Sequence, residues 1–407
     1  MTLTKLALIG GTALTLSLSA ALAYGNDAFL DQSGADNSAL ITQSGDNNDA
    51  GSNAQNVTQL GNRNDLTIDQ SGNDNRIGLG ANADSALLGV TQTRGTNQSN
   101  YQSNTMSITQ TSAQNSVGSA VQSATGQRAL SNRLTITQGG SGGNRVDSIY
   151  QRQSSTVTNI ATITQNGSGN TLARVSQDAR VGGSYNPNEI TVTMEGTDNG
   201  GAGSLTGAAA ASGALSSTLI RGTDLGTKGN KITLNVGGSL NQFGVSQYGN
   251  NNSVGTLTIS GTMNEVGVHR DGAFNSLTLG DVSGAGNNLG LRQMGNFNVA
   301  AVNVQGDYNG GPAFSGGVAG RLATSAGLTA GLMEQNGDGN SIDLTVLGDN
   351  NIFASLQSST GTGIGSGNSI DGTQDGDGDQ VAVVQNGTLN MASFTQTGNG
   401  NNAAISQ

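Results

Sequence analysis

The side chains that could carry out nucleophilic or acid–base chemistry are few in this sequence. Cysteine is absent, the single histidine is His269, and glutamate occurs only at Glu189, Glu195, Glu265 and Glu334. A catalytic site needs a nucleophile, a base and a group that orients the base. These residues do not form such a set, so we expect no catalytic residues, no cofactor and no enzyme activity.

The densest group of carboxylates is Asp375, Asp377 and Asp379, which are separated by single glycines. Because hard cations such as Ca²⁺ take oxygen ligands from turns of this composition, the three aspartates are weak candidates for a metal site. The segment lacks a bidentate glutamate at the right distance and the glycine-rich nonapeptide of calcium-binding β-helices. We expect no bound metal, and we expect His269 to be a solvated surface residue.

The composition argues against an ordinary globular core. Glycine accounts for 65 of 407 residues, aromatic residues for 3% and charged residues for 11%. Few large side chains are available for burial, yet the low charge also argues against a typical disordered chain. The formal net charge of -11 repels phosphate backbones, so nucleic acid is not an expected partner.

The first residues predict export. Lys5 precedes an apolar run over residues 6–22, and the run ends in the small-x-small pattern Ala21-Leu22-Ala23. This is typical of a signal peptide at residues 1–23, whereas a membrane anchor would be longer and would lack a cleavage site. We expect a secreted protein with no membrane span after cleavage.

A repeat covers most of residues 24–407. Its unit is Asn-x-φ-x-φ-x-Gln-x-Gly-x-x-Asn, where φ is apolar and the last Asn opens the next unit. Clear copies begin at Asn37, Asn64 and Asn390. The residues that define the copies used here are Asn37, Gln43, Gly45, Asn64, Gln70, Gly72, Asn75, Gln165, Gly167, Asn170, Gln247, Gly249, Gln293, Gly295, Gln335, Gly337, Asn340, Gln385, Gly387, Asn390, Gln396, Gly398, Asn401 and Gln407.

This spacing predicts an all-β fold. The repeat places Asn, two apolar residues and Gln at alternate positions, which makes a β-strand with these four side chains on one face. Glycine supplies the positive backbone dihedral angle φ that a tight turn needs. Two strands and two turns close one rung, and rungs stack because a single hairpin could not bury its inner face. We expect a β-solenoid, or cross-β stack, in which Asn and Gln amides form ladders along the stack.

Two stretches lose the repeat frame. Residues at about 197–229 and 310–333 are rich in Gly, Ala and Ser, so they are expected to be irregular insertions at turns of a single solenoid domain.

The motif Gln-x-Gly-x-x-Asn, preceded six residues earlier by Asn, resembles the curlin repeat of curli subunits. The resemblance implies a functional amyloid subunit that forms extracellular fibres at the bacterial surface for adhesion and biofilm. Its partners would be further copies of itself, stacked end to end, with other curlin-repeat subunits and curli-type export machinery as further candidates.

Other interpretations of the sequence remain open. The same composition occurs in disordered, prion-like segments. Outward threonine pairs at 135 and 137, 162 and 164, and 191 and 193 resemble ice-binding surfaces, although threonine also has high strand propensity. A monomeric solenoid adhesin that presents the two insertions is a third possibility, and size and fibre measurements would separate it from a polymer.

Overall fold

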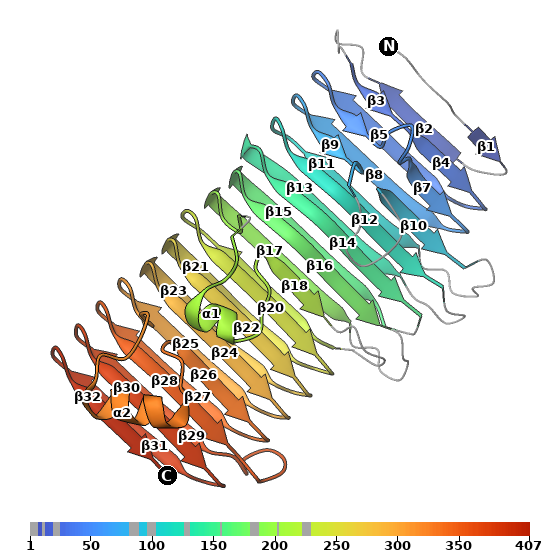
Figure 1. Cartoon of the computed structure of the whole chain (residues 1–407). Helices are drawn as coiled ribbons and strands as arrows, with labels where there is room; N and C mark the ends of the chain where they lie inside the picture. The colour runs from blue at the N-terminus through green and yellow to red at the C-terminus, as the bar shows by residue number, and fades with distance from the viewer. Residues whose placement is uncertain are drawn as a thin grey trace. The chain divides into compact units, whose positions relative to one another are not determined.

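The computed structural model describes residues 7–9, 13–18, 25–80, 89–95, 103–125, 131–154, 157–179, 187–201, 203–221 and 229–407. These residues form two compact units. Unit 1 comprises Met1–Asp198 with Ile220–Gly229, and unit 2 comprises Asn199–Leu219 with Asn230–Gln407. In both units β-strands of two parallel sheets, A and B, alternate along the chain (Figure 1). The predicted stack of two-stranded rungs is confirmed.

In unit 1 the early strands of sheet A are interrupted and the later ones are continuous. Sheet A contains β1 (Ala7–Ile9), β3 (Asp27–Ala28), β4 (Leu30–Ser33), β6 (Asp49–Ala50), β7 (Val57–Leu60), β9 (Arg76–Ile77), β10 (Val90–Arg94), β12 (Ser116–Ala124), β14 (Arg145–Gln153) and β16 (Thr171–Ala179). Sheet B contains β2 (Ala13–Leu18), β5 (Ser38–Ser44), β8 (Asn64–Ser71), β11 (Asn104–Gln110), β13 (Asn132–Gly142), β15 (Asn159–Ser168) and β17 (Asn188–Thr197).

In unit 2 the strands follow the same alternation. Sheet A contains β20 (Gln242–Tyr248), β22 (Glu265–Asp271), β24 (Asn288–Met294), β26 (Leu332–Asn336), β28 (Ile352–Ser358), β30 (Gln380–Asn386) and β32 (Asn402–Ser406). Sheet B contains β19 (Lys231–Val236), β21 (Ser253–Thr262), β23 (Ser276–Ala285), β25 (Val299–Gln305), β27 (Ser341–Leu347), β29 (Ser369–Asp375) and β31 (Met391–Thr397). The division between the units falls within β18 (Thr218–Arg221).

The strands pair in the register that the repeat predicts. In β8 and β11, Asn64 pairs with Asn104 and Gln70 with Gln110. Since side chains alternate between the two faces of a strand, this register places equivalent side chains directly above one another along the stack.

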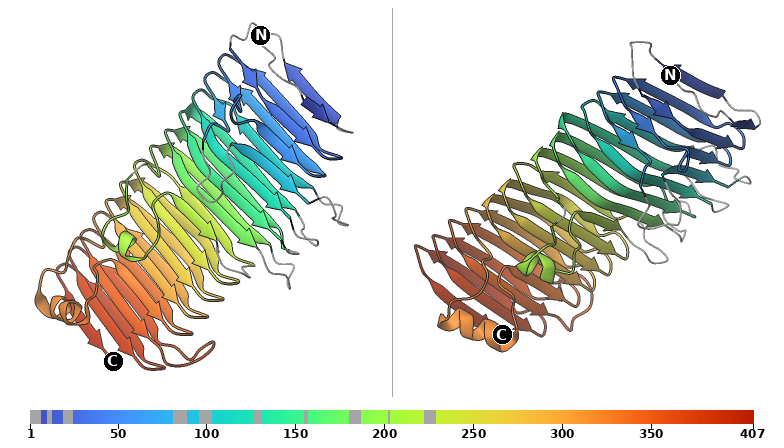
Figure 2. Two further views of the ribbon diagram at one scale, coloured as in Figure 1. Left: turned by 45° about the vertical axis from the view of Figure 1, so that its right-hand side comes forward. Right: turned by 45° about the horizontal axis from the view of Figure 1, so that its top comes forward.

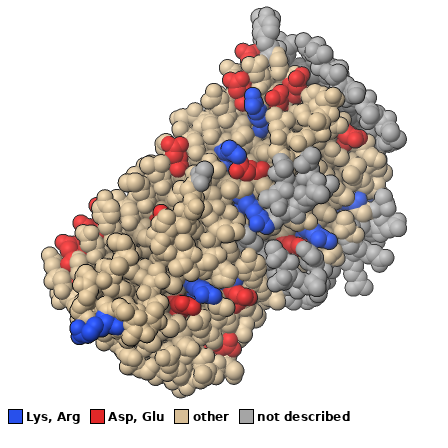
Figure 3. Space-filling model, in the orientation of Figure 1, with Lys and Arg blue, Asp and Glu red and all other residues tan. Residues whose placement is uncertain are grey.

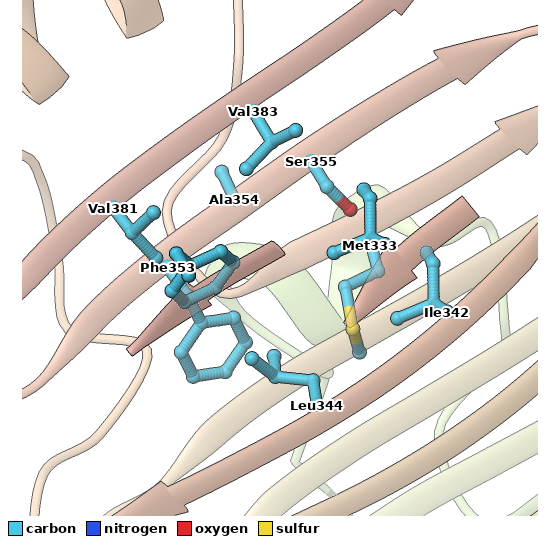
Figure 4. Close-up of a pocket in the computed structure, with 10 residues that line it drawn as sticks. Met333, Ile342, Leu344, Phe353, Ala354, Ser355, Val381 and Val383 are labelled. Carbon is cyan, nitrogen blue, oxygen red and sulfur yellow. The ribbon is translucent and has the colours of Figure 1, made fainter. Parts of the chain in front are cut away.

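The interior between the two sheets is thin and apolar. Val, Ile and Leu at the apolar positions of the repeat are buried in most strands, as in β8, where buried residues alternate with exposed or partly exposed ones. Near β28 the interior leaves a cavity of only about 10 Å³, lined by Met333, Leu344 and Phe353 among others (Figure 4). Such a space holds at most about one water molecule, so the packing is close to that of an ordinary protein core.

The two predicted insertions are more ordered than expected. The first contains helix α1 (Gly207–Ala211) and strand β18, and the second contains helix α2 (Gly317–Ala326). Both helices lie on the outer face of sheet A in unit 2 (Figure 2). A side chain at Gly267 or Gly290 of that face would collide with the backbone of α1, so these glycines allow the close approach.

Strands β1 and β2 fall within the predicted signal peptide. Leu14, Leu16 and Leu18 of β2 pair with Ala39, Ile41 and Gln43 of β5. The alternation of leucine with small polar residues over 13–18 matches the period of a strand, which explains the pairing. Cleavage after Ala23 stays a prediction. No helix among the described residues is long and apolar enough to span a membrane.

Candidate functional site: the stacked amide ladders

Glutamines of sheet B form a continuous ladder in unit 1. Gln43 donates from Nε2 to Oε1 of Gln70 at 2.9 Å, and Gln70 donates in the same way to Gln110 at 3.0 Å. Gln110 donates to Gln138 and Gln138 to Gln165, both at 2.8 Å. These side chains are buried, so each amide gains its partner where water is excluded.

Sheet A of unit 1 carries a second ladder of the same polarity. Each glutamine donates to the glutamine of the following strand, and the series comprises Gln32, Gln59, Gln92, Gln122, Gln151 and Gln177. The carbonyl oxygen of Gln32, which begins the series, is buried and has no hydrogen-bond partner among the described residues.

In unit 2 the ladder of sheet A runs to the last residue of the chain. Gln293 donates to Gln335 at 2.8 Å, and the series continues through Gln357 and Gln385 to Gln407. In sheet B most strands have a valine or isoleucine at this position, such as Val304 and Val346, and a short ladder begins only where Gln374 donates to Gln396.

The asparagine that opens each repeat forms hydrogen bonds with backbone groups. Oδ1 of Asn37 accepts the backbone N–H of Asn64, and Nδ2 of Asn37 donates to the carbonyl groups of Ser33 and Gly61. The same pattern recurs in unit 2, where Asn340 accepts the N–H of Asn368 and donates to the Asn336 carbonyl. Each asparagine therefore fixes the turn before it and links that turn to the neighbouring rung.

The glycine of the repeat is required because turns stack directly on one another. Gly249 has a φ of 86°, and a Cβ on it would lie 2.0 Å from the carbonyl oxygen of Gly272. Both the left-handed backbone conformation and the close contact exclude a side chain.

The structure brings most of the predicted ladder and turn residues together. Gln165 ends its ladder, where Nε2 faces Sδ of Met194 at 3.6 Å. Gln247 donates to the Lys231 carbonyl but its own carbonyl oxygen has no partner within the described segments. The predicted turn glycines at 45, 72, 249, 295, 337, 387 and 398 have positive φ, whereas Gly167 does not but lies equally close to the backbone of Gly196.

Arg270 interrupts the ladder of sheet A in unit 2. In register it lies between Gln247 and Gln293. Its side chain is fully buried, and none of its guanidinium nitrogens has a hydrogen-bond partner within the described chain. Burial lowers the pKa of Arg270 to about 9. The sequence contains the signal for this residue, because Arg270 follows Asn264 at the spacing that the repeat reserves for Gln.

The three candidate metal ligands have separate roles. Asp379 is fully buried at an asparagine position, where its Oδ1 accepts from the backbone N–H and Nδ2 of Asn401. Asp377 accepts the backbone N–H of Asp349 in the neighbouring turn. Asp375 is exposed at the end of β29. Among the described residues there is no group of three metal-ligating side chains.

His269 is not the solvated residue that we expected. It is partly buried on the outer face of β22, with its ring 5.6 Å from that of Tyr248 and close to Gly213 of the first insertion. Desolvation, followed by the positive charge of Arg292, lowers the pKa of His269. The expectation was wrong because it did not include a segment folding over this face.

The predicted threonine pairs do form an outward array. Thr135, Thr162 and Thr191 are in register on β13, β15 and β17, and the threonines two residues further on form a parallel row. Their side chains are exposed or partly exposed. The pairs occur on these three neighbouring strands of unit 1, and Thr109 of β11 continues the second row beside Thr137.

Comparison with known protein families identifies part of the repeat. Residues 25–51 match the family model of the curlin associated repeat, and no curated protein matches the chain. The matched segment contains β3 to β6 and the Asn37, Gln43 and Gly45 positions of the repeat. The resemblance predicted from the sequence is therefore confirmed for this segment, and the chain contains a curlin associated repeat.

Proposed function

We propose that this protein is a secreted structural subunit that assembles with further copies of itself into extracellular amyloid fibres, which serve cell adhesion and the biofilm matrix. The observation that carries the proposal is the single polarity of the glutamine ladders. Within each ladder every glutamine except the last donates to the glutamine of the following strand, so one side of each ladder presents amide donors and the other presents acceptors.

The side formed by β31 and β32 presents donors. Nε2 of Gln396 donates to the Gln380 carbonyl, and Nε2 of Gln407 donates to the Met391 carbonyl. Because an amide nitrogen carries two hydrogens, each retains one for a further partner. At the beginning of the ladder in unit 1, the Gln32 carbonyl oxygen lacks a donor among the described residues. In the described structure β1, which lies within the predicted signal peptide, pairs with β4 at this position. Removal of that segment would leave the Gln32 carbonyl oxygen free to accept from the donors of another copy.

The backbone of β32 presents an open edge as well. The backbone N–H of Gln407 donates to Val384, and the Asn401 carbonyl accepts from Gln380. Because these groups alternate along a strand, those of Ala404 and Ser406 point away from β30. An unpaired strand edge is a template for another chain. On the face shown in Figure 3, acidic and basic side chains are scattered among uncharged residues.

The test is fibre formation by the exported protein, followed by thioflavin fluorescence, electron microscopy and fibre diffraction. We expect fibres whose diffraction pattern has a reflection at about 4.7 Å, the spacing of paired strands. Ala404→Pro removes an outward N–H and should slow assembly strongly, while Ala404→Ser keeps the N–H and should assemble normally. Monodisperse protein without fibres at high concentration would refute the proposal.

The threonine array of unit 1 supports a second candidate, ice binding. The register of the threonines on β13, β15 and β17 is the observation that favours it. Thermal hysteresis that disappears when Thr162 and Thr164 are replaced by valine would support this function, and an absence of hysteresis in the unaltered protein would exclude it.

A further inference from the structure

A groove of about 550 Å³ lies on unit 2 where the two insertions meet the turns of the stack. The first insertion contributes Thr206 and Gly207 to its lining, and the second contributes Pro312, Thr329 and Ala330. The stacked turns contribute Tyr308 and Asn350. Neither helix of the insertions belongs to a rung, although β18 of the first insertion is a strand of sheet A. The groove therefore gives both insertions a shared location that the assembly proposal does not explain.

Tyr308 offers an aromatic surface in this groove. Its ring lies against Gly286, where a Cβ would be 2.8 Å from the Tyr308 ring, and the residue is 56% exposed. Its backbone has a φ of 57°, an unfavourable conformation for a residue of this size. Gly286 thus supports one part of the ring and leaves the rest free for a ligand.

The polar groups around the ring are uncharged. The side chains of Tyr308, Thr329 and Asn350 form no hydrogen bond with any part of the chain that the structure describes, and no Asp, Glu, Lys, Arg or His lines the groove. Ile352, Pro312 and Ala330 add apolar surface. Asp307 and Asp349 lie next to Tyr308 and Asn350 in the chain, so the surroundings disfavour an anionic ligand.

We propose that this groove binds a neutral oligosaccharide. The C–H face of a sugar ring packs on an aromatic side chain, while its hydroxyl groups both donate and accept hydrogen bonds with neutral groups such as those of Asn350 and Thr329. The volume is in the range of small-ligand sites. A peptide fits less well, because the groove contains turns instead of an open strand edge to which a peptide could add. The site is independent of fibre assembly.

The test uses the full chain with cellotetraose and mannotetraose as neutral probes, tetragalacturonate as the anionic probe and a Gly-Ser peptide, measured by saturation-transfer NMR and titration calorimetry. We expect at least one neutral sugar to bind and the other two probes not to bind. Tyr308→Asn should weaken sugar binding at least about tenfold. Asparagine is tolerated in this backbone conformation, since Asn350 adopts it in the next turn of the same column.

The matched control is Leu240→Asn, because Leu240 has a φ of 59° at an equivalent turn position and does not line the groove. This variant should bind the sugar like the unaltered protein. The proposal is overturned if neither neutral sugar binds, if tetragalacturonate or the peptide binds more tightly, or if Tyr308→Asn and Leu240→Asn have the same effect.

Discussion

Arg270 occupies in β22 the ladder position that Gln293 occupies in β24, yet no guanidinium nitrogen of Arg270 donates to the Gln293 side chain. The carbonyl oxygens of Gln247 and Gln293 on either side also lack partners in the described chain. A fully buried charge without hydrogen bonds opposes folding, so this position is the weakest point of the ladder in unit 2.

Replacing Arg270 with glutamine should join Gln247 and Gln293 into one ladder. Because the change removes a buried charge and supplies partners for unsatisfied groups, Arg270→Gln should raise the free energy of unfolding by about 1–3 kcal/mol. Urea denaturation of the two proteins measures the difference. Arg292→Gln is the control, since Arg292 is a partly exposed residue with an ion pair to Glu334, and this variant should change stability by less than about 1 kcal/mol.

The effect of Arg270 should depend on pH at the alkaline end. Its pKa of about 9 in the folded state lies well below the ordinary value that it has in the unfolded chain. Between these values the unfolded chain binds more protons than the folded chain, so this group makes stability rise with pH. The amount by which Arg270→Gln raises the free energy of unfolding should be constant below about pH 9 and should become smaller above it. Denaturation midpoints at a series of pH values test this, and a constant difference would contradict it.

Removing a glutamine from the middle of a ladder should be costly. Gln110 accepts from Gln70 at 3.0 Å and donates to Gln138 at 2.8 Å. Gln110→Leu keeps much of the volume but leaves the Gln138 carbonyl oxygen without a donor, so we expect a loss of about 1–3 kcal/mol. Thr109→Val changes a neighbouring, outward residue and should alter the denaturation midpoint little. Equal effects of the two variants would show that the ladder adds no stability.

Asp379 should be replaceable by asparagine with a gain in stability. It occupies a buried asparagine position but has no side-chain donor when ionised, and its Oδ2 is unpaired in the described chain. The equivalent Asn351 donates from Nδ2 to the Gly376 carbonyl at 2.8 Å. Asp379→Asn should therefore add about 1 kcal/mol, measured by thermal unfolding. Asp377→Asn, at an exposed turn, is the control, and a destabilised Asp379→Asn would contradict the argument.

The repeat frame predicts the strands, the stacking register and the ladders because period-two alternation and turn glycines are local properties of the sequence. Arg270 and Asp379 each take a position that the repeat assigns to an amide. Arg270 was not among the predicted residues and Asp379 was expected only as a weak metal candidate, so their place in the stack came from the structure. The helices of the insertions were not predicted, because their Ala- and Gly-rich segments become ordered only by packing on sheet A, as at Gly267 and Gly290. The partial burial of His269 has the same tertiary origin.

The turn glycines differ in what surrounds them along the stack. A Cβ at Gly376 would lie 2.0 Å from the carbonyl oxygen of Gly398, whereas a Cβ at Gly398 would meet no atom within 4 Å. An alanine at residue 398 would thus have to overcome only an unfavourable φ in an isolated molecule. Once another molecule adds to β31, the same methyl group would collide with the newcomer. Mutational tolerance at this glycine would then distinguish a free subunit from one inside a fibre.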